Sequence, residues 1–512
     1  MPKQAKVIMI QGTASNVGKS MLTAALCRIF KQDGYSVAPF KSQNMALNAF
    51  VTEDGGEIGR AQAVQAEAAG IEPTVDMNPI LLKPEKEHSA QLIVRGRVQG
   101  NVKPGEISAK SEELLNIAME SLNKLRSQYD IVVIEGAGSP AEINLSKHEI
   151  ANMRVAKEAS APVLLVGSID RGGVYAALYG TVAIIDVVDA ARIKGFIINK
   201  LRGTASLLEP ANQILSDKTR IPVLGMVPYY HNISIAEEDN VVLETLQPEQ
   251  NDKYDLDIAI MRTPYISNHD DFDPLKAFGG SLRYVHNTNE LGNPHIIILP
   301  GSKNTFSDIK WLKETRLAQA IIEQNTKGTV IIGICGGYQM MGIDISDPFG
   351  MEKSAEEQDG LHQKTTGLAL LPTHTVFAKD KRIRQAIADI LHQRGILQGV
   401  PAENLIGYEI HMGRTTSDSN YILKIQAKDG DGGMLDGAIN DRGNAFGTYL
   451  HGIFDNSDFT AALLNNIRKY YNLPERHDMT GINRNAEYNK LAQNVRQSLD
   501  MTKIYEILDK GL

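Results

Sequence analysis

The first 33 residues contain the pattern that constrains the fold most: a buried strand, a glycine-rich loop and an amphipathic helix in direct succession. Residues 7–11 form an apolar run, the loop extends from Gly12 to Ser20, and helical periodicity follows. This order is typical of a P-loop, in which the loop amides and the helix N-terminus bind phosphates. Lys19 is then expected to reach the β- and γ-phosphates, and the Ser20 hydroxyl to hold Mg²⁺.

The loop differs in one respect from the common pattern. Five residues separate Gly12 from Gly18, where the usual spacing has four, and Thr13 occupies the expected first glycine. A glycine-rich turn without a ligand is the alternative, but the flanking strand and helix favour a nucleotide site with contacts from Thr13 and Gly18.

Further apolar runs alternate with helical segments along the first half of the chain. The expected strands lie at residues 36–40, 130–135, 162–167, 193–198 and 223–227, with helices at 174–185 and 207–215. Strands that alternate with helices predict a parallel sheet covered on both faces. The first domain is therefore expected to be α/β and to end near residue 230.

One of these strands ends in an acidic residue, and another runs into a polar stretch. Glu135 closes the run 130–135, and residues 41–45 follow the run 36–40. Open α/β sheets bind ligands at the carboxyl ends of their strands. Glu135 is thus a candidate for the carboxylate that supports Mg²⁺ after a P-loop, and a helix-cap or turn residue is the alternative.

Length and composition give the domain organisation. A chain of 512 residues exceeds one hydrophobic core. The acidic and polar composition of residues 231–255 suits a linker. We expect a P-loop domain at 1–230, that linker, a second α/β domain at 256–456, and a C-terminal helical extension at 457–512.

Charge and cysteine content indicate the class of protein. The net charge of −8 argues against a nucleic-acid or anionic-membrane partner, and two cysteines cannot form a disulfide framework. No apolar run reaches the roughly 18 residues that span a bilayer, and the first residues lack the features of a signal peptide. We expect a cytoplasmic protein, with homo-oligomerisation left open.

A cysteine among glycines marks the second domain. The apolar run 329–334 ends at Cys335, which is followed by Gly336, Gly337 and a helical segment. A sharp strand-to-helix turn of this kind exposes a nucleophile and aims backbone amides at a developing oxyanion. A buried structural cysteine is the alternative. His451 follows a later strand, and a Cys–His pair that meets in space would support thiolate chemistry, with the histidine accepting the thiol proton.

Two motifs of the second domain resemble the class I glutamine amidotransferases. They are Gly333-Ile334-Cys335-Gly336-Gly337-Tyr338-Gln339 and Gly447-Thr448-Tyr449-Leu450-His451-Gly452. The resemblance implies that Cys335 attacks glutamine, that His451 is its base, and that the amides of Gly336 and of the loop at Gly301 form the oxyanion hole. The family's usual Glu, two residues after the histidine, is replaced here by Ile453, so the group that orients His451 is not identified.

The first half resembles the dethiobiotin synthetase-like ligases, whose P-loop has the same extra residue. Longer motifs resemble the cobyric acid synthase family. They are residues 39–45, 57–62, 78–84, 135–145, 170–174, 299–305 and 407–413. The resemblance extends from about Ala5 to Asp455.

This resemblance implies an ATP- and glutamine-dependent ligase. It would amidate the b, d, e and g carboxylates of adenosylcobyrinic acid a,c-diamide to give adenosylcobyric acid, through acyl phosphates and ammonia from glutamine. The corrinoid is the substrate, so the protein needs no cobalt of its own. The alternatives are a cobyrinic acid a,c-diamide synthase and a partitioning-type P-loop ATPase switch, although the switch leaves Cys335 and His451 unexplained.

The resemblance also assigns roles in the first half. Glu57 and Glu135 would be metal carboxylates, Lys41 would neutralise the transferred phosphoryl group, and Asn199 would read the purine. The residues expected to contact the corrinoid are Gln43, Asn44, Glu142 and Asn144.

Overall fold

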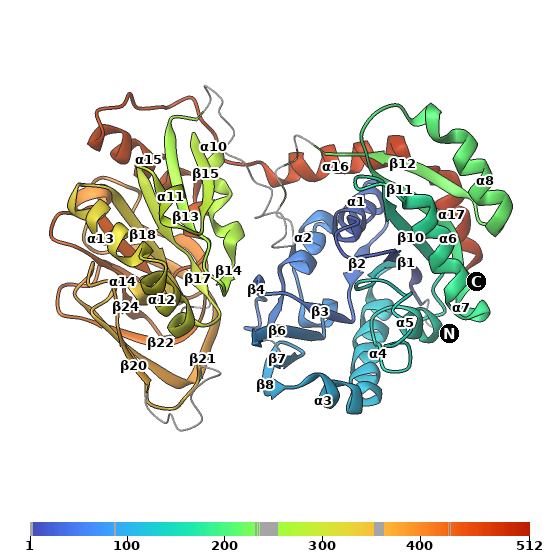
Figure 1. Cartoon of the computed structure of the whole chain (residues 1–512), viewed down its shortest axis with the longest axis horizontal. Coiled ribbons are helices and arrows are strands. Elements are labelled where there is room, and N and C mark those ends of the chain that lie inside the picture. Colours follow the sequence, from blue (N-terminus) through green and yellow to red (C-terminus); the bar gives the residue numbers. More distant parts are fainter. Residues whose placement is uncertain are drawn as a thin grey trace. The chain divides into compact units, whose positions relative to one another are not determined.

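The computed structural model describes residues 4–86, 89–230, 233, 235, 254–352, 363–428, 430 and 432–511. The chain forms two compact units (Figure 1). Unit 1 comprises Met1–Ala46, Gly56–Asp239 and Asn483–Leu512, and unit 2 comprises Leu47–Gly55 and Asn240–Ile482.

A parallel six-stranded sheet forms the centre of unit 1. Its strands, in spatial order, are β12 (Val223–Pro228), β11 (Ile193–Leu201), β10 (Val163–Ser168), β1 (Lys6–Gly12), β9 (Ile131–Glu135) and β2 (Val37–Phe40). Every neighbouring pair is parallel. The α/β class and the parallel sheet expected from the apolar runs are confirmed.

Two hydrophobic cores cover the two faces of this sheet. Val7 and Met9 of β1 belong to one core, and Ile8 and Ile10 belong to the other, because successive strand residues point to opposite faces. The first core contains residues of α4 (Ser111–Gln128), α5 (Met153–Glu158), α6 (Val174–Ile184) and α8 (Glu209–Thr219). The second contains residues of α1 (Lys19–Gln32), α2 (Arg60–Ala69), α16 (Arg484–Ser498) and α17 (Met501–Lys510).

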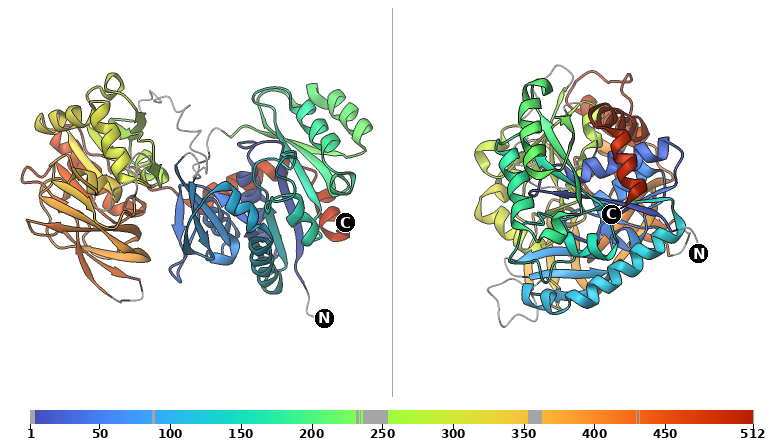
Figure 2. Two further views of the ribbon diagram at one scale, coloured as in Figure 1. Left: turned by 60° about the horizontal axis from the view of Figure 1, so that its bottom comes forward. Right: turned by 90° about the vertical axis from the view of Figure 1, so that its right-hand side faces the viewer.

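The C-terminal segment thus covers the sheet that the N-terminal segment begins. Leu491 and Val495 of α16 are fully buried in the second core, and Lys6 pairs with Asp509 at 2.6 Å. Both chain ends lie in unit 1 (Figure 2). The structure divides the expected extension 457–512 between the units, because α15 (Ser457–Tyr470) belongs to unit 2.

Smaller elements complete unit 1. Another sheet has the order β3 (Gln43–Met45), β6 (Ile80–Lys86), β7 (Ser89–Val94) and β8 (Arg97–Val102). The remaining short elements are β5 (Glu57–Gly59), η1 (Val75–Met77), α3 (Pro104–Ala109), α7 (Val187–Ala190) and η2 (Ala205–Leu208).

Unit 2 contains a second α/β sheet. Its strands, in spatial order, are β15 (Gly280–Val285), β13 (Leu256–Met261), β16 (Ile296–Leu299), β18 (Val330–Ile334), β26 (Ala445–Thr448) and β25 (Ala438–Ile439). The strands are parallel except for β25, which pairs antiparallel with β26. The accompanying helices are η3 (His269–Phe272), α10 (Pro274–Ala277), α11 (Thr288–Leu291), α12 (Thr305–Glu314), α13 (Leu317–Thr326), α14 (Gly336–Met341), η4 (Gly395–Leu397) and η5 (Ile453–Asp455).

A mixed sheet with two long strands adjoins this core. It contains β20 (Gln363–Thr366), β19 (Asp344–Asp347), β21 (Thr373–Ile390), β23 (Leu423–Ala427) and β24 (Met434–Asp436), with β22 (Leu405–Ser417) paired to β21. The short strands β4 (Ala49–Val51), β14 (Ile266–Ser267) and β17 (Gly301–Ser302) also belong to unit 2.

The expected linker 231–255 lies mostly outside the described residues. Its last residue, Asp255, is part of unit 2, where its carboxylate accepts two hydrogen bonds of 2.8 Å from the buried Arg468. No helix in the described ranges has the length and apolar character needed to cross a bilayer.

Candidate functional site

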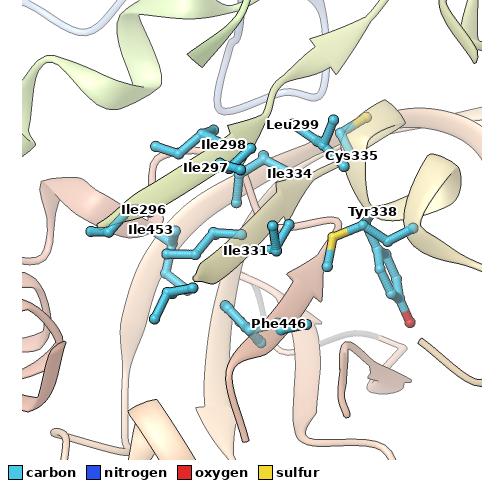
Figure 3. Close-up of a cluster of buried hydrophobic side chains, with 14 of the residues drawn as sticks. Ile296, Ile297, Ile298, Leu299, Ile331, Ile334, Cys335, Tyr338, Phe446 and Ile453 are labelled. Atoms are coloured by element: carbon cyan, nitrogen blue, oxygen red, sulfur yellow. The ribbon is translucent and has the colours of Figure 1, made fainter. Parts of the chain in front are cut away.

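Cys335 occupies a sharp turn between β18 and α14. Its backbone has φ 52° and ψ −106°, a conformation that non-glycine residues rarely adopt. Neighbouring glycines are required here, because a Cβ at Gly337 would lie 1.8 Å from the Leu299 carbonyl oxygen and one at Gly336 would lie 2.8 Å from the Ser302 nitrogen. Figure 3 shows Cys335 at the end of β18, beyond the isoleucines of the sheet. The turn therefore holds the thiol in a fixed position at the carboxyl end of β18.

His451 is the partner of Cys335 in unit 2. Its side chain is buried and interacts directly with the Cys335 thiol. Burial alone would lower the pKa of His451, but the negative charges of Asp271 and of a Cys335 thiolate raise that pKa to about 10. His451 is therefore placed to exchange a proton with the Cys335 thiol, which is what a nucleophilic cysteine requires of its partner.

Asp271 in η3 is the group that orients His451, and it was not predicted from the sequence. His451 Nδ1 donates to Asp271 Oδ2 at 2.6 Å, and the Gly452 amide donates to Asp271 Oδ1 at 3.2 Å. With Nδ1 fixed in this way, Nε2 is left for the proton of the thiol, as in other nucleophile–His–carboxylate systems. The carboxylate lies 180 residues before the histidine, so no local spacing could have indicated it.

The loop proposed to stabilise the oxyanion lies next to the same site. A Cβ at Gly301 would meet His451 Cε1 at 3.2 Å, and Gly336 packs against Ser302. Ser302 Oγ donates to Asp308 Oδ2 at 2.5 Å, and burial raises the pKa of Asp308 to about 7. Gly301 and Gly336 are thus brought together with Cys335 and His451, while their role as amide donors stays a prediction.

Strand β22, which carries the motif 407–413, lines the other side of the Cys–His pair. The Tyr408 ring stacks on His451 with centroids 5.0 Å apart and planes 10° apart. The Ile410 carbonyl oxygen lies 3.8 Å from the Cys335 sulfur. Next to it, Glu409 contacts both His411 and Arg384. Burial raises the pKa of Glu409, but His411 and Arg384 have the larger effect and lower this pKa to about 2.

The P-loop of unit 1 accommodates its extra residue with two left-handed positions. Asn16 has φ 59° and Gly18 has φ 93°. A Cβ at Gly18 would lie 2.2 Å from Asn199 Nδ2, so the position requires glycine for space as well as conformation. Lys19 Nζ donates to the carbonyl oxygens of Ala14 at 3.0 Å and Gly138 at 3.3 Å. The Thr13 amide donates to the Val166 carbonyl at 2.9 Å, which joins the loop to the sheet.

Three of the predicted site residues meet at the carboxyl ends of the central strands. Ser20 Oγ donates to Glu135 Oε1 at 2.7 Å, and Lys41 Nζ lies 3.0 Å from the same oxygen. Gln65 of α2, which was not predicted, donates to Glu135 Oε2 at 2.5 Å. Hydroxyl and carboxylate oxygens are ligands that Mg²⁺ prefers, so Ser20 and Glu135 fit this ion.

Glu57, the other expected metal carboxylate, has a different partner. It forms a buried ion pair with Lys83 at 2.7 Å. Within the described ranges, no group of three or more His, Cys, Asp or Glu side chains is placed to hold a metal ion by itself. A magnesium site in unit 1 would therefore draw on the Ser20 hydroxyl and on oxygens of the nucleotide as well as on carboxylates.

Asn199 lies against the P-loop, while the predicted corrinoid residues are spread over unit 1. Asn199 Nδ2 donates to the Val17 carbonyl at 2.8 Å, and its buried Oδ1 has no hydrogen-bond partner in the described part of the chain. Asn44 is buried and donates to Gln62, and Gln43 is half-buried, whereas Glu142 and Asn144 are exposed in the segment between β9 and α5. The buried acceptor of Asn199 suits a donor such as an adenine amino group.

Two domain families match this chain. Residues 8–243 match the CobQ/CobB/MinD/ParA nucleotide binding domain, and residues 257–459 match the CobB/CobQ-like glutamine amidotransferase domain. These ranges contain the P-loop cluster and the Cys335 site, respectively.

The chain is similar to curated proteins over its full length. A cobyric acid synthase of Dehalococcoides mccartyi (strain CBDB1) is 53% identical over 99% of this chain and 100% of its own. A cobyric acid synthase of Lachnoclostridium phytofermentans is 47% identical over 99% and 100%, respectively. Among solved structures, PurLQS from Thermotoga maritima aligns with 42% of this chain and 99% of its own at 18% identity and a TM-score of 0.31, and so low a score supports no conclusion about this chain.

Proposed function

Because this chain belongs to the cobyric acid synthase family, we propose that it amidates the b, d, e and g carboxylates of adenosylcobyrinic acid a,c-diamide to give adenosylcobyric acid. The observation that carries the proposal is the Cys335–His451–Asp271 arrangement, which provides a glutaminase centre in a chain that also has a nucleotide-binding unit. Glutamine would supply the nitrogen, and ATP would activate the carboxylates.

The glutaminase half begins with attack of the Cys335 thiolate on the δ-carboxamide carbon of glutamine. The amides of Gly336 and of the Gly301–Ser302 loop stabilise the negative charge on the amide oxygen. The His451 imidazolium donates its Nε2 proton to the leaving nitrogen, so ammonia departs and a thioester remains. Water then attacks the thioester, with His451 as the base and Asp271 holding the ring in place. Glutamate is released, and Cys335 and His451 return to their starting state.

The synthetase half converts a poor electrophile into a good one. A carboxylate has no adequate leaving group. Transfer of the γ-phosphoryl group of ATP to the carboxylate releases ADP and gives an acyl phosphate, and ammonia then attacks its carbonyl carbon while inorganic phosphate leaves and the nitrogen loses a proton. The loop amides from Thr13 to Gly18 and the Lys19 ammonium would bind the phosphates, and Lys41 would offset charge on the transferred group. Asn199 would accept a hydrogen bond from the purine.

Magnesium would be held by Ser20 and Glu135, with Glu57 contributing after it exchanges its contact with Lys83. When bound, the ion would neutralise charge on the phosphates of ATP. The corrinoid would contact Gln43, Asn44, Glu142 and Asn144, and its cobalt arrives already ligated. We place these steps in the cytoplasm.

A cobyrinic acid a,c-diamide synthase is the second candidate, because the same two activities serve different carboxylates there. The full-length relatives named cobyric acid synthase favour the first candidate. A partitioning-type ATPase switch would leave the Cys335 centre without a role.

Mass spectrometry separates these candidates. The protein is incubated with adenosylcobyrinic acid a,c-diamide, ATP, Mg²⁺ and glutamine, and products are followed over time. Four successive acid-to-amide steps are expected. Amidation of only the a and c carboxylates of cobyrinic acid would support the second candidate, and corrinoid-independent ATP hydrolysis without any amidation would support the switch.

A further inference from the structure

A short segment from the first part of the sequence is built into unit 2. Leu47–Gly55 belongs to unit 2, although the residues before and after it belong to unit 1. Ala49 and Val51 of β4 are buried in a small core with Tyr408 and Ile410 of β22. Gln385 Nε2 also donates to the Val51 carbonyl at 3.1 Å. The segment is therefore part of the unit that contains Cys335.

Asn48 in this segment forms reciprocal hydrogen bonds with the start of η3. Its Oδ1 accepts from the Asn268 amide at 2.8 Å, while Asn268 Oδ1 accepts from the Ala49 amide at 3.0 Å. Asn48 Nδ2 lies 2.8 Å from His269 Nε2. Both asparagines are buried, since Asn48 is 1% exposed and Asn268 is 2% exposed. Water therefore does not compete for these hydrogen bonds.

Asn268 continues this network to the catalytic group. Its Nδ2 donates to the Tyr408 hydroxyl at 3.0 Å, and that hydroxyl lies 3.4 Å from Asp271 Oδ1. The Tyr408 ring is stacked on His451. A buried hydrogen-bond chain thus runs from Asn48 through Asn268 and Tyr408 to Asp271, which holds His451 beside Cys335.

Asn48 also contacts the backbone at Asn268, and through it can affect the position of the turn that carries Asp271. Asn268 is left-handed, with φ 52° and ψ 44°, and it directly precedes the 3₁₀ turn that carries Asp271. The Asn48 carboxamide holds the amide of this residue and the ring of the next one. Loss of these two contacts frees the turn to relax, and a small displacement of Asp271 is enough to misalign His451.

We propose that Asn48 is a positioning residue of the glutaminase centre, which acts on Asp271 and His451 through Asn268 and Tyr408. This inference rests on the proposed function of the Cys335 site. Its consequence is that the glutaminase centre depends on a segment encoded between Asn44 and Glu57, two residues expected to serve the synthetase reaction.

The test compares Asn48→Ala with Glu53→Gln in the full-length protein. Glu53 lies in the same segment, is exposed, and pairs only loosely with Lys428 at 3.4 Å. We expect Asn48→Ala to lower kcat for glutamine hydrolysis on the order of tenfold with little change in the KM for glutamine, because misplacement of catalytic groups affects chemistry more than binding. Glu53→Gln should match the wild type. Equal rates for the two variants would overturn the proposal.

Alkylation of Cys335 by iodoacetamide gives a readout that does not depend on the proposed reaction. Peptide mass spectrometry distinguishes Cys335 from the other free cysteine, the buried Cys27. Slower alkylation in Asn48→Ala is expected, since the thiolate loses its aligned imidazolium. Unchanged alkylation would refute the positioning role. If alkylation is slower in the variant but the wild type hydrolyses no glutamine, the proposed function alone is refuted.

A double-mutant cycle that combines Asn48→Ala with Tyr408→Phe tests whether Asn48 acts through the Tyr408 hydroxyl. The phenylalanine keeps the stacked ring and removes only the hydroxyl. If Asn48 acts through that hydroxyl, the two effects are not multiplicative, and multiplicative effects would contradict the route. If Asn48→Ala does not fold, Asn268→Gly takes its place in both the rate comparison and the cycle. Glycine accepts the left-handed conformation, while the hydrogen bonds of the Asn268 side chain are lost.

Discussion

Asp271→Asn is the substitution that tests the catalytic centre most directly. The wild-type carboxylate accepts the His451 Nδ1 proton at 2.6 Å. Asparagine has nearly the same shape, and its remaining oxygen can still accept from the Gly452 amide that now binds Oδ1 at 3.2 Å. The substitution thus removes one negative charge and sets an amide donor against Nδ1–H, while the backbone contact that fixes η3 to the histidine loop is kept.

The size of the effect follows from the charges. Two opposite charges about 4 Å apart attract by about 4 kcal/mol at an effective dielectric constant of about 20. A factor of ten in an equilibrium constant corresponds to about 1.36 kcal/mol. Loss of this attraction should therefore lower the equilibrium constant for forming the imidazolium by roughly three orders of magnitude. The direction of the His451 pKa is consistent with this attraction, since Asp271 and Cys335 raise it from 6.5 to about 10 although burial lowers it. We expect kcat/KM for glutamine hydrolysis to fall about 10³-fold.

The pH dependence has a definite sign. A raised His451 pKa keeps this ring protonated below about pH 10, so its positive charge beside Cys335 persists through neutral pH. In the asparagine variant the His451 pKa falls, so the ring loses its proton at lower pH and no longer stabilises negative charge on the Cys335 sulfur there. Glutamate release and the pH profile of Cys335 alkylation measure the two effects, and the alkylation profile should shift toward higher pH.

Ammonia-supported amidation provides the control for this variant, because it bypasses the Cys335 centre. It should proceed at the wild-type rate in Asp271→Asn. A loss of kcat/KM smaller than tenfold, together with an unchanged alkylation profile, would refute the assignment of Asp271.

Three further predictions concern the two units. Cys335→Ala should abolish glutamine-supported amidation and spare ammonia-supported amidation, and loss of both would indicate a structural cysteine. Lys19→Ala should stop amidation from either nitrogen source but leave some glutamine hydrolysis, and surviving amidation would contradict the P-loop assignment. Asp255→Asn should destabilise unit 2 by about 3 kcal/mol in urea unfolding, because it leaves the guanidinium of Arg468 buried with a weaker partner; an unchanged unfolding midpoint would show that the pair contributes nothing.

Much of unit 1 was predictable because its strands are short apolar runs that end in polar residues. The run at residues 7–11 became β1 (Lys6–Gly12), and the run ending at Glu135 became β9. Both are buried on the two faces, which is why no alternation of polar residues interrupts them. The α/β fold expected from these runs and the family implied by the motif resemblance are confirmed, while the ligand roles of single residues remain predictions.

Asp271 was not predictable from the sequence. It lies in a polar stretch, Asn268-His269-Asp270-Asp271, of the kind that usually forms a surface turn. The left-handed Asn268 turns the chain so that Asp271 is buried. The pairing of Glu57 with Lys83 was hidden for a similar reason, because sequence spacing does not show which of several buried charges will meet.

Two segments also lie in units other than those their sequence positions suggest. Leu47–Gly55 belongs to unit 2, and residues 483–512 belong to unit 1. A helical extension was expected at 457–512, and α16 and α17 each bury one face, but a helical pattern does not say against which sheet that face will pack. Only the three-dimensional partners decide such cases.

The return of α16 and α17 to the first sheet has a consequence for biosynthesis. Residues 483–512 leave the ribosome after the whole of unit 2, yet they cover one face of the sheet that begins at β1. Until then Ile8, Ile10 and Leu164 lack part of their covering layer. Unit 2, in contrast, has all of its elements translated before α16 emerges. The order of synthesis and the order of completion are thus reversed: the unit that is started first is finished last, and until α16 and α17 emerge its sheet keeps one face only partly covered, as apolar surface that can aggregate.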